Sequence, residues 1–150
     1  YTMNDEMDDF VATPGTVNSV EPGKWPLSSM SPTLVLDSEG RSFMTIGSPG
    51  ATRIFPTVAQ VISNVIDFGF PIQEAILAPR VYQAASGDLH LEGRYPVGAL
   101  DGIKKLGHNV SLHADWDAYF GGVHAIVYDY DAGLLYGGAD PRRDGQAAAF

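Results

Sequence analysis

The residues with the clearest potential for chemistry form a short glycine-rich stretch, Gly47-Ser48-Pro49-Gly50, followed by Ala51. Two glycines and a proline allow backbone conformations that bulkier residues resist. Consecutive backbone N–H groups can then point into one concavity, beside the unpaired N–H groups of a following helix. Such a concavity suits a carboxylate, a phosphate or the oxyanion of an acyl-transfer intermediate. The stretch also fits a tight strand-to-helix connection that binds nothing, and both interpretations stay open at this point.

A second candidate is the acidic block at residues 4–10, which holds the four carboxylates Asp5, Glu6, Asp8 and Asp9. Carboxylates this close repel one another unless they are solvated or face a cation. The block lacks the alternating ligands, central glycine and terminal glutamate of an EF-hand calcium loop. A carboxylate pair that grips an ammonium group fits the residue types better, and a solvated turn remains the alternative.

Two adjacent hydroxyl groups, those of Ser28 and Ser29, lie in a segment that Pro26 and Pro32 hold extended. They are hydrogen-bond donors suited to a carboxylate, although serines in loops often bond to their own backbone. The preceding residues, 11–25, contain several turn-forming pairs and no sustained apolar period. A long irregular segment is uncommon in a compact domain unless it is functional or covers a site.

Other chemically active residue types are predicted to have structural roles. The four histidines are scattered without the spacing of a metal site, so neither a metal nor a cofactor is expected. His124 has apolar neighbours and is predicted to be a strand residue, not a base. Ser48 does not lie in a Gly-x-Ser-x-Gly elbow. Arg142 and Arg143 are predicted to pair with acidic neighbours.

Composition places the chain among globular proteins. Its 150 residues, 45% of them hydrophobic, are enough for one domain with a sizeable core, so residues 1–150 are predicted to form a single domain. The formal charge of −9 argues against a nucleic-acid-binding surface and against adhesion to an anionic membrane. No apolar run is long enough to span a bilayer. The absence of cysteine rules out disulfides and thiol catalysis, and it leaves the compartment open.

The elements that must position the candidate residues alternate between short strands and helices. Residues 33–37 and 41–46 are predicted to form a β-hairpin, and its second strand leads into the glycine-rich stretch. A helix is predicted at residues 55–68, where apolar residues recur with helical spacing before Gly69 and Pro71. Further predicted elements are the end of a strand at residues 1–3, helices at 72–78 and 96–106, strands at 88–92 and 108–112, and a second hairpin at 122–131 and 134–137. Strands beside paired helices indicate a layered α+β fold.

Four segments, taken together and in order, resemble a known family. They are residues 4–10, the run Pro-Leu-Ser-Ser-Met-Ser-Pro-Thr at 26–33, Gly-Ser-Pro-Gly at 47–50 with Arg53-Ile54, and Ala-Asp-Pro-Arg at 139–142. They resemble the small, C-terminal subunit of γ-glutamyltranspeptidase, and the resemblance runs almost from end to end. Members are N-terminal nucleophile hydrolases with an αββα sandwich, of which this chain would be an incomplete portion.

The resemblance implies an activity and a role for each candidate. In the family, a precursor cleaves itself to expose a threonine, which is the nucleophile and, through its own α-amine, the base. The enzymes move a γ-glutamyl group from glutathione or similar donors to water, an amino acid or a peptide. The family's ammonium binders fall on Glu6 and Asp9, and its carboxylate binders fall on Ser28 and Ser29. The two backbone N–H groups of its oxyanion hole fall on Gly50 and Ala51.

The chain departs from the family pattern in several places. Ala51 stands where the family usually has a second glycine, and a positive φ is costly for alanine. Residues 81–88 do not match a histidine-rich segment common in bacterial members, which leaves acceptor preference open. The nucleophilic threonine is not found, because Thr2 directly precedes the acidic block in the position of a late strand. An arginine that completes carboxylate binding belongs to the large subunit.

Three interpretations follow from the resemblance. The favoured one is that the chain is the C-terminal part of a γ-glutamyltransferase or glutathione hydrolase that also needs its large subunit, with the chain alone inactive and prone to self-association. The second is an acylase of the same fold that acts on another acyl group, as in cephalosporin acylases and capsule depolymerases. The third is a non-catalytic isolated domain. A family-like location would be periplasmic or extracellular.

Overall fold

The computed structural model describes residues 6–149, and the chain divides into two compact units, residues 1–30 and 31–150. The predicted strand end at residues 1–3 and the first two residues of the acidic block, Asn4 and Asp5, lie outside the described residues.

The first unit is largely irregular. It begins with a short 3-10 helix, η1 (Glu6–Asp9), and continues through turns and bends to residue 30, as predicted for residues 11–25. A polar cluster holds the turns together, because the buried Ser19 hydroxyl contacts the Thr16 carbonyl (2.8 Å) and the Glu21 carboxylate (2.7 Å), while Lys24 Nζ donates to Ser19 Oγ. Hydrogen bonds to backbone and side chains thus replace an apolar core in this unit.

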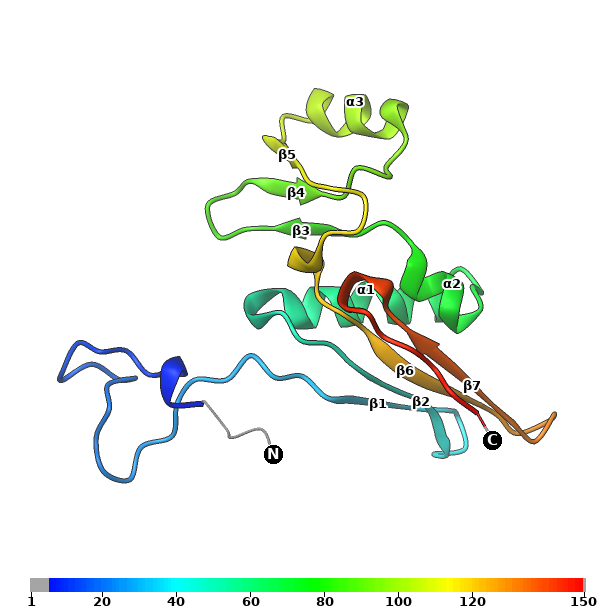
Figure 1. Ribbon diagram of the computed structural model, residues 1–150, viewed down its shortest axis with the longest axis horizontal. Coiled ribbons are helices and arrows are strands. Elements are labelled where there is room, and N and C mark those ends of the chain that lie inside the picture. The colour runs from blue at the N-terminus through cyan, green and yellow to red at the C-terminus, as the bar shows by residue number, and fades with distance from the viewer. Residues whose placement is uncertain (1–5, 150) are drawn as a thin grey trace. The chain divides into compact units, whose positions relative to one another are not determined.

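The second unit contains a four-stranded antiparallel sheet with the strand order β1-β2-β6-β7 (Figure 1). The strands are β1 (Thr33–Leu36), β2 (Ser42–Gly47), β6 (His124–Asp129) and β7 (Leu134–Ala139). Both predicted hairpins are confirmed. The first turn closes because the Asp37 carboxylate accepts hydrogen bonds from the backbone N–H groups of Glu39 and Arg41, with Gly40 at a φ of 79°.

Two helices cover one face of this sheet. They are α1 (Ile54–Ile66) and α2 (Ile72–Leu77), close to their predicted positions. The apolar stripe of α1, which includes Val58 and Val61, packs with Met44 of β2 and Ala125 of β6 in one buried core. The opposite face of the sheet exposes Leu34, Ile126 and Leu135, so α1 and α2 cover only one of its two faces.

A smaller sheet follows α2 and contains β3 (Val81–Gln83), β4 (Leu89–Leu91) and β5 (Val110–Leu112). Strand β3 is missing from the predicted elements, because three residues are too few to show a period. Strands β4 and β5 are parallel, and α3 (Val97–Lys105) lies between them in the sequence. Helix α1 contacts β2 and β3, so it lies between the two sheets (Figure 1).

A buried ionic cluster of Arg80, Glu92, Asp140 and Arg142 ties α2 and the smaller sheet to the C-terminal end of β7. Arg142 bonds both oxygens of Glu92 at 2.6 Å, and Arg80 lies 2.7 Å from Asp140. This confirms the predicted ion pairing of Arg142. Burial and the Arg142 cation lower the pKa of Arg80 to about 10. Burial raises the pKa of Asp140, but the two cations and two backbone N–H donors outweigh it, leaving that pKa below its usual range.

Candidate functional site

The glycine-rich stretch forms a turn whose backbone N–H groups are available to a ligand. Gly50 has a φ of 139° and Ala51 a φ of 52°, both positive. Neither residue's N–H donates to a protein acceptor among the residues that the structure describes. Their carbonyls instead begin η2 (Ala51–Arg53), with the Arg53 N–H donating to Gly50 O at 3.1 Å. The two N–H groups therefore precede the N-terminus of α1, where the helix dipole favours negative charge.

The turn is held from one side by two consecutive glycines, Gly121 and Gly122. The Gly122 N–H donates to Ser48 Oγ at 3.1 Å, and the Ser48 hydroxyl donates to Pro49 O at 2.8 Å. A Cβ at Gly121, whose φ is 89°, would lie 2.5 Å from Ser48 Oγ and 2.9 Å from Pro49 O. Only glycine allows the two segments to approach this closely.

The segment before these glycines forms a short 3-10 helix, η3 (Ala118–Phe120), which contacts the residues that follow the turn. Arg53 Nε donates to Tyr119 O at 2.7 Å, and its guanidinium carbon lies 4.4 Å from the centre of the Tyr119 ring. Phe120 O accepts from Thr57 of α1 and from buried Arg80. From the sequence, residues 114–121 are predicted only as an aromatic loop. The partners Arg53 and Thr57 lie more than 60 positions away, so no pattern within the loop predicts these contacts.

The four predicted substrate-binding side chains lie in the first unit. Glu6 and Asp9 are the first and last residues of η1, and positions i and i+3 of a 3-10 helix share a face. Asp9 is exposed. The Ser28 hydroxyl oxygen accepts a hydrogen bond from the Met30 N–H at 3.3 Å, which leaves the hydroxyl proton to donate elsewhere. Glu6 and Asp9 thus belong to one short helix of the first unit, whereas Gly50 and Ala51 belong to the second unit.

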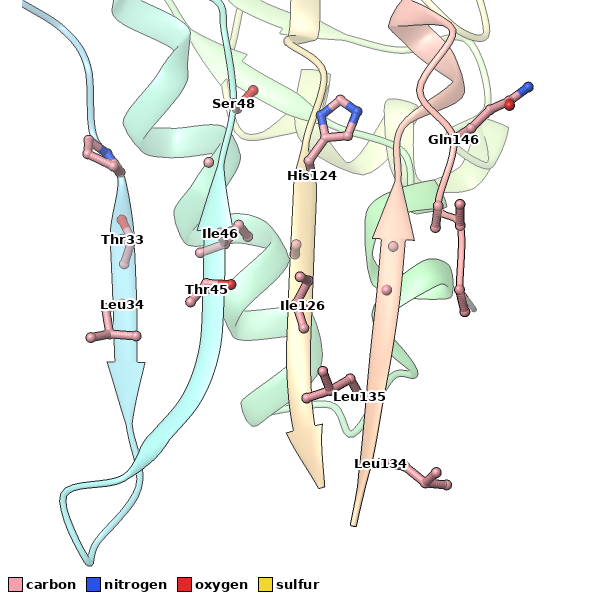
Figure 2. Close-up of a pocket in the computed structure, with 18 of the residues that line it drawn as sticks. Thr33, Leu34, Thr45, Ile46, Ser48, His124, Ile126, Leu134, Leu135 and Gln146 are labelled. Atoms are coloured by element: carbon pink, nitrogen blue, oxygen red, sulfur yellow. The ribbon is translucent and has the colours of Figure 1, made fainter. Parts of the chain in front are cut away.

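The open face of the large sheet carries a broad groove of about 1170 Å³. Figure 2 shows Ser48 and His124 at one end of this groove and Leu134 and Leu135 at the other. His124 is the first residue of β6 and pairs in register with Gly47, so its predicted place in a strand is confirmed. Its exposed imidazole lines the groove beside the glycine-rich turn, a position that its apolar neighbours in the sequence do not reveal.

Within residues 6–149 there is no group of three or more His, Asp or Glu side chains placed to hold a metal ion. No helix in the same part of the chain has the length and apolar character to cross a membrane.

Comparison with known proteins decides the family, because the family model of gamma-glutamyltranspeptidase matches residues 1–150. The chain belongs to this family. Among curated relatives, it is 38% identical to the glutathione hydrolase proenzyme of Escherichia coli over 151 aligned residues, covering 93% of this chain and 25% of that protein. It is 39% identical to the acylase ACY 1 proenzyme of Pseudomonas sp. strain SE83 over 147 residues, covering 98% of this chain and 25% of the relative.

A solved structure agrees with the family assignment. A mutant of Helicobacter pylori gamma-glutamyltranspeptidase superposes with a TM-score of 0.81 at 38% identity, covering 95% of this chain and 82% of that one. The predicted α+β fold of the γ-glutamyltranspeptidase type is therefore confirmed. The chain spans about a quarter of the length of the curated relatives described above.

Proposed function

We propose that these 150 residues are the C-terminal portion of the small subunit of an enzyme that transfers the γ-glutamyl group of glutathione or a related donor to amino acids, peptides or water. The observation that carries the proposal is the pair of unengaged N–H groups on Gly50 and Ala51, held at the N-terminus of α1. The threonine nucleophile would come from outside these residues, and a large subunit would complete the pocket. The chain alone would therefore be inactive.

In the proposed reaction, the two N–H groups stabilise the charge that develops on the carbonyl oxygen of the γ-glutamyl amide. The threonine hydroxyl gives its proton to the threonine α-amine as its oxygen attacks the carbonyl carbon, and the carbonyl oxygen becomes an oxyanion, which the Gly50 and Ala51 N–H groups bind. Collapse of this intermediate breaks the amide C–N bond, and the amine leaves with that proton. Water or an acceptor amine, deprotonated by the same α-amine, then takes the γ-glutamyl group from the threonine oxygen. Donors fixed in advance cost no reorganisation during the reaction, and removal of one such donor typically costs about 2.7–4 kcal/mol. The bonds from Gly122 and Arg53 supply that fixation.

The head of a γ-glutamyl donor carries an ammonium and a carboxylate on one carbon. We assign the ammonium to Glu6 and Asp9, which lie on one face of η1, since a cation between two carboxylates forms charge-assisted hydrogen bonds. We assign the carboxylate to the hydroxyls of Ser28 and Ser29. The Ser28 oxygen already accepts from the Met30 N–H, and its hydroxyl proton is the group that would donate to the carboxylate.

The competing function is that of an acylase with a different acyl group. Identity to the acylase relative (39%) differs from identity to the glutathione hydrolase relative (38%) by one percentage point, so overall similarity does not choose between them. The four head-group residues favour a γ-glutamyl donor, because an acyl group without an α-amino acid head needs neither carboxylates nor paired hydroxyls.

Asp9→Ala in the processed enzyme that contains this chain tests the choice. We expect kcat/KM for a γ-glutamyl anilide to fall by a factor that corresponds to about 2–5 kcal/mol, because a charged hydrogen bond is lost. Activity on the glutaryl anilide, which lacks the ammonium, should change little. Asp8→Ala is the matched control, since Asp8 is an exposed carboxylate of the same helix.

Two results would contradict the proposal. If Asp9→Ala reduces both activities equally, Asp9 does not bind the ammonium. If the unmodified enzyme prefers the glutaryl anilide to the γ-glutamyl anilide, the acylase function is correct instead.

A further inference from the structure

Three side chains outside the proposed pocket form a continuous hydrogen-bonded chain. His90 of β4 and His113, one residue beyond β5, approach with Nδ1 of His90 2.8 Å from Nε2 of His113. The other nitrogen of His113, Nδ1, lies 3.0 Å from Oδ2 of Asp117. All three side chains are half-buried. We call Asp117, His113 and His90 the histidine chain.

The contacts determine where the protons of the histidine chain lie. An ionised Asp117 only accepts, so His113 Nδ1 must carry a proton. A neutral His113 then has a lone pair on Nε2, and His90 Nδ1 must donate to it. The ionised state of Asp117 is favoured because hydrogen bonds from the Tyr119 N–H and from His113 lower the pKa of its carboxyl against a smaller effect of burial.

The histidine chain connects directly to the turn that carries the proposed oxyanion hole. Asp117 Oδ1 accepts from the Tyr119 N–H at 2.8 Å and so caps η3. The Tyr119 ring stacks on the His113 ring with centroids 4.5 Å apart. Tyr119 O holds Arg53, whose own N–H holds Gly50 O at 3.1 Å. Each link is a directional contact, so displacement of the histidines would be transmitted to Gly50.

We propose that the histidine chain positions the Gly50 and Ala51 N–H groups, and that a second added proton on the histidine pair releases them. This deepens the proposed function, on which it rests for its effect on catalysis. His113 and His90 are positioning residues, since they contact the loop and not the substrate.

The number of free nitrogen lone pairs explains why the second added proton breaks the bond between the two histidines. The first added proton can bind His90 Nε2, and the bond from His90 Nδ1 to His113 Nε2 survives. The second must bind His113 Nε2, which places two N–H donors and two positive rings against each other at a separation of 2.8 Å. The bond is then lost, and like charges drive the rings apart.

The charges around the histidine pair also favour one added proton over two. Asp117 contacts His113, and Asp88 precedes β4 close enough to sense the charge of His90. Arg53 adds a cation over Tyr119, and the rings of Tyr82 and Tyr119 lie against His90. Two carboxylates against one cation offset one further positive charge and not two.

The first test needs no activity. Labelling with 13C-carbonyl glycine and 15N alanine selects the Gly-Ala pairs, of which the sequence has three, at 50–51, 98–99 and 138–139. The Ala51→Gly variant identifies the Ala51 signal. In a pH titration of the intact protein, the Ala51 amide shift should follow the second of two coupled histidine steps, while the Ala99 signal in α3 should not.

The second test uses His90→Asn in the processed enzyme. Asparagine keeps an N–H donor for His113 and cannot take up a proton. On lowering the pH through the histidine step, kcat of the unmodified enzyme for a γ-glutamyl anilide should fall by about tenfold or more, the scale expected for a small misplacement of catalytic groups. KM should stay unchanged, and His90→Asn should lack this step. His108→Asn, at an exposed histidine before β5, is the matched control and should keep it.

The outcomes separate the two proposals. The positioning role is wrong if the Ala51 signal ignores the histidine step, or if His90→Asn and the unmodified enzyme lose kcat in parallel. If the Ala51 signal follows the histidines but the enzyme does not act on γ-glutamyl donors, the positioning role stands and the proposed function is wrong.

Discussion

Ala51→Gly tests whether the turn with the two N–H groups is strained in solution. Ala51 is one of two non-glycine residues with a positive φ in the described chain, and its φ of 52° lies in the left-handed region. That conformation costs an L-residue roughly 1–2 kcal/mol, and glycine removes this cost. Glycine itself loses more backbone entropy on folding, by roughly 0.5–1 kcal/mol relative to alanine. The difference predicts a variant that is as stable as the unmodified protein or up to about 1.5 kcal/mol more stable.

Ala59→Gly is the matched control for this prediction. Ala59 is an exposed residue inside α1, so the same substitution there relieves no strain and should destabilise by about 1 kcal/mol. The two variants should therefore differ in unfolding free energy by roughly 1–2 kcal/mol, measured by urea unfolding monitored by circular dichroism. The N–H of residue 51 survives the change, so activity of the processed enzyme should persist.

Equal destabilisation by Ala51→Gly and Ala59→Gly would refute the reasoning. Residue 51 would then have a negative φ in solution, and its N–H would not point beside that of Gly50. The oxyanion assignment would fail together with the strain argument, because both depend on the same backbone conformation.

Two further predictions concern the support of this turn. Gly121→Ala should lower kcat for a γ-glutamyl anilide by about tenfold or more, because the added Cβ collides with Ser48. Gly133→Ala is the control and should not lower kcat, since Gly133 has a φ of 65° and a Cβ there has no atom within 4 Å. Equal kinetics of the two variants would show that the close approach to Ser48 is unimportant. Asp140→Asn should destabilise the protein by roughly 3–5 kcal/mol at pH 7, because Arg80 and Arg142 lose their buried partner. The folded-state pKa of Asp140 lies below its unfolded value of about 3.9, so its contribution is present above that pH and is lost as pH falls through the lower folded pKa. Urea unfolding between pH 7 and 2.5 should therefore show an acid-side loss that Asp140→Asn lacks, and parallel curves for the two proteins would contradict this.

The sequence predicts local features of this fold well. The hairpin around Gly40 and the helix at α1 follow from turn residues and from the spacing of Val58 and Val61, which act over a few positions. Strand β3 does not, because its three residues become a strand only by pairing with β4. The sequence predicts that Arg142 pairs with an acidic neighbour, and Asp140 is such a neighbour. Arg142 also bonds to Glu92, which lies 50 positions away in the sequence. No local pattern records such a contact.

The same limit explains what was missed at the site. The histidines are scattered in the sequence, yet the parallel pairing of β4 with β5 places His90 opposite Ser111 and brings His113 to its side. Residues 88–92 alternate, and residues 108–112, just before His113, are also predicted to form a strand, but nothing in the sequence states that the two strands are neighbours. The resemblance, by contrast, predicts a positive φ at position 51, where the family usually has glycine, and Ala51 has this positive φ.

The carbonyl of Phe120 lies between the buried ionic cluster and the segment that the histidine chain contacts. It accepts from Thr57 of α1 and from Arg80 of the buried ionic cluster, and it follows Tyr119, which the histidine chain holds. Burial raises the pKa of Asp140, but the Arg80 cation, two backbone N–H donors and the Arg142 cation keep it below its usual range, so the Arg80–Asp140 pair resists acid. Acidification should therefore release the turn at Gly50 first, while the Arg80–Asp140 pair still holds the fold. Loss of kcat should precede loss of the circular dichroism signal, with a separate midpoint for each. A single shared midpoint would mean that the turn is held by global stability alone.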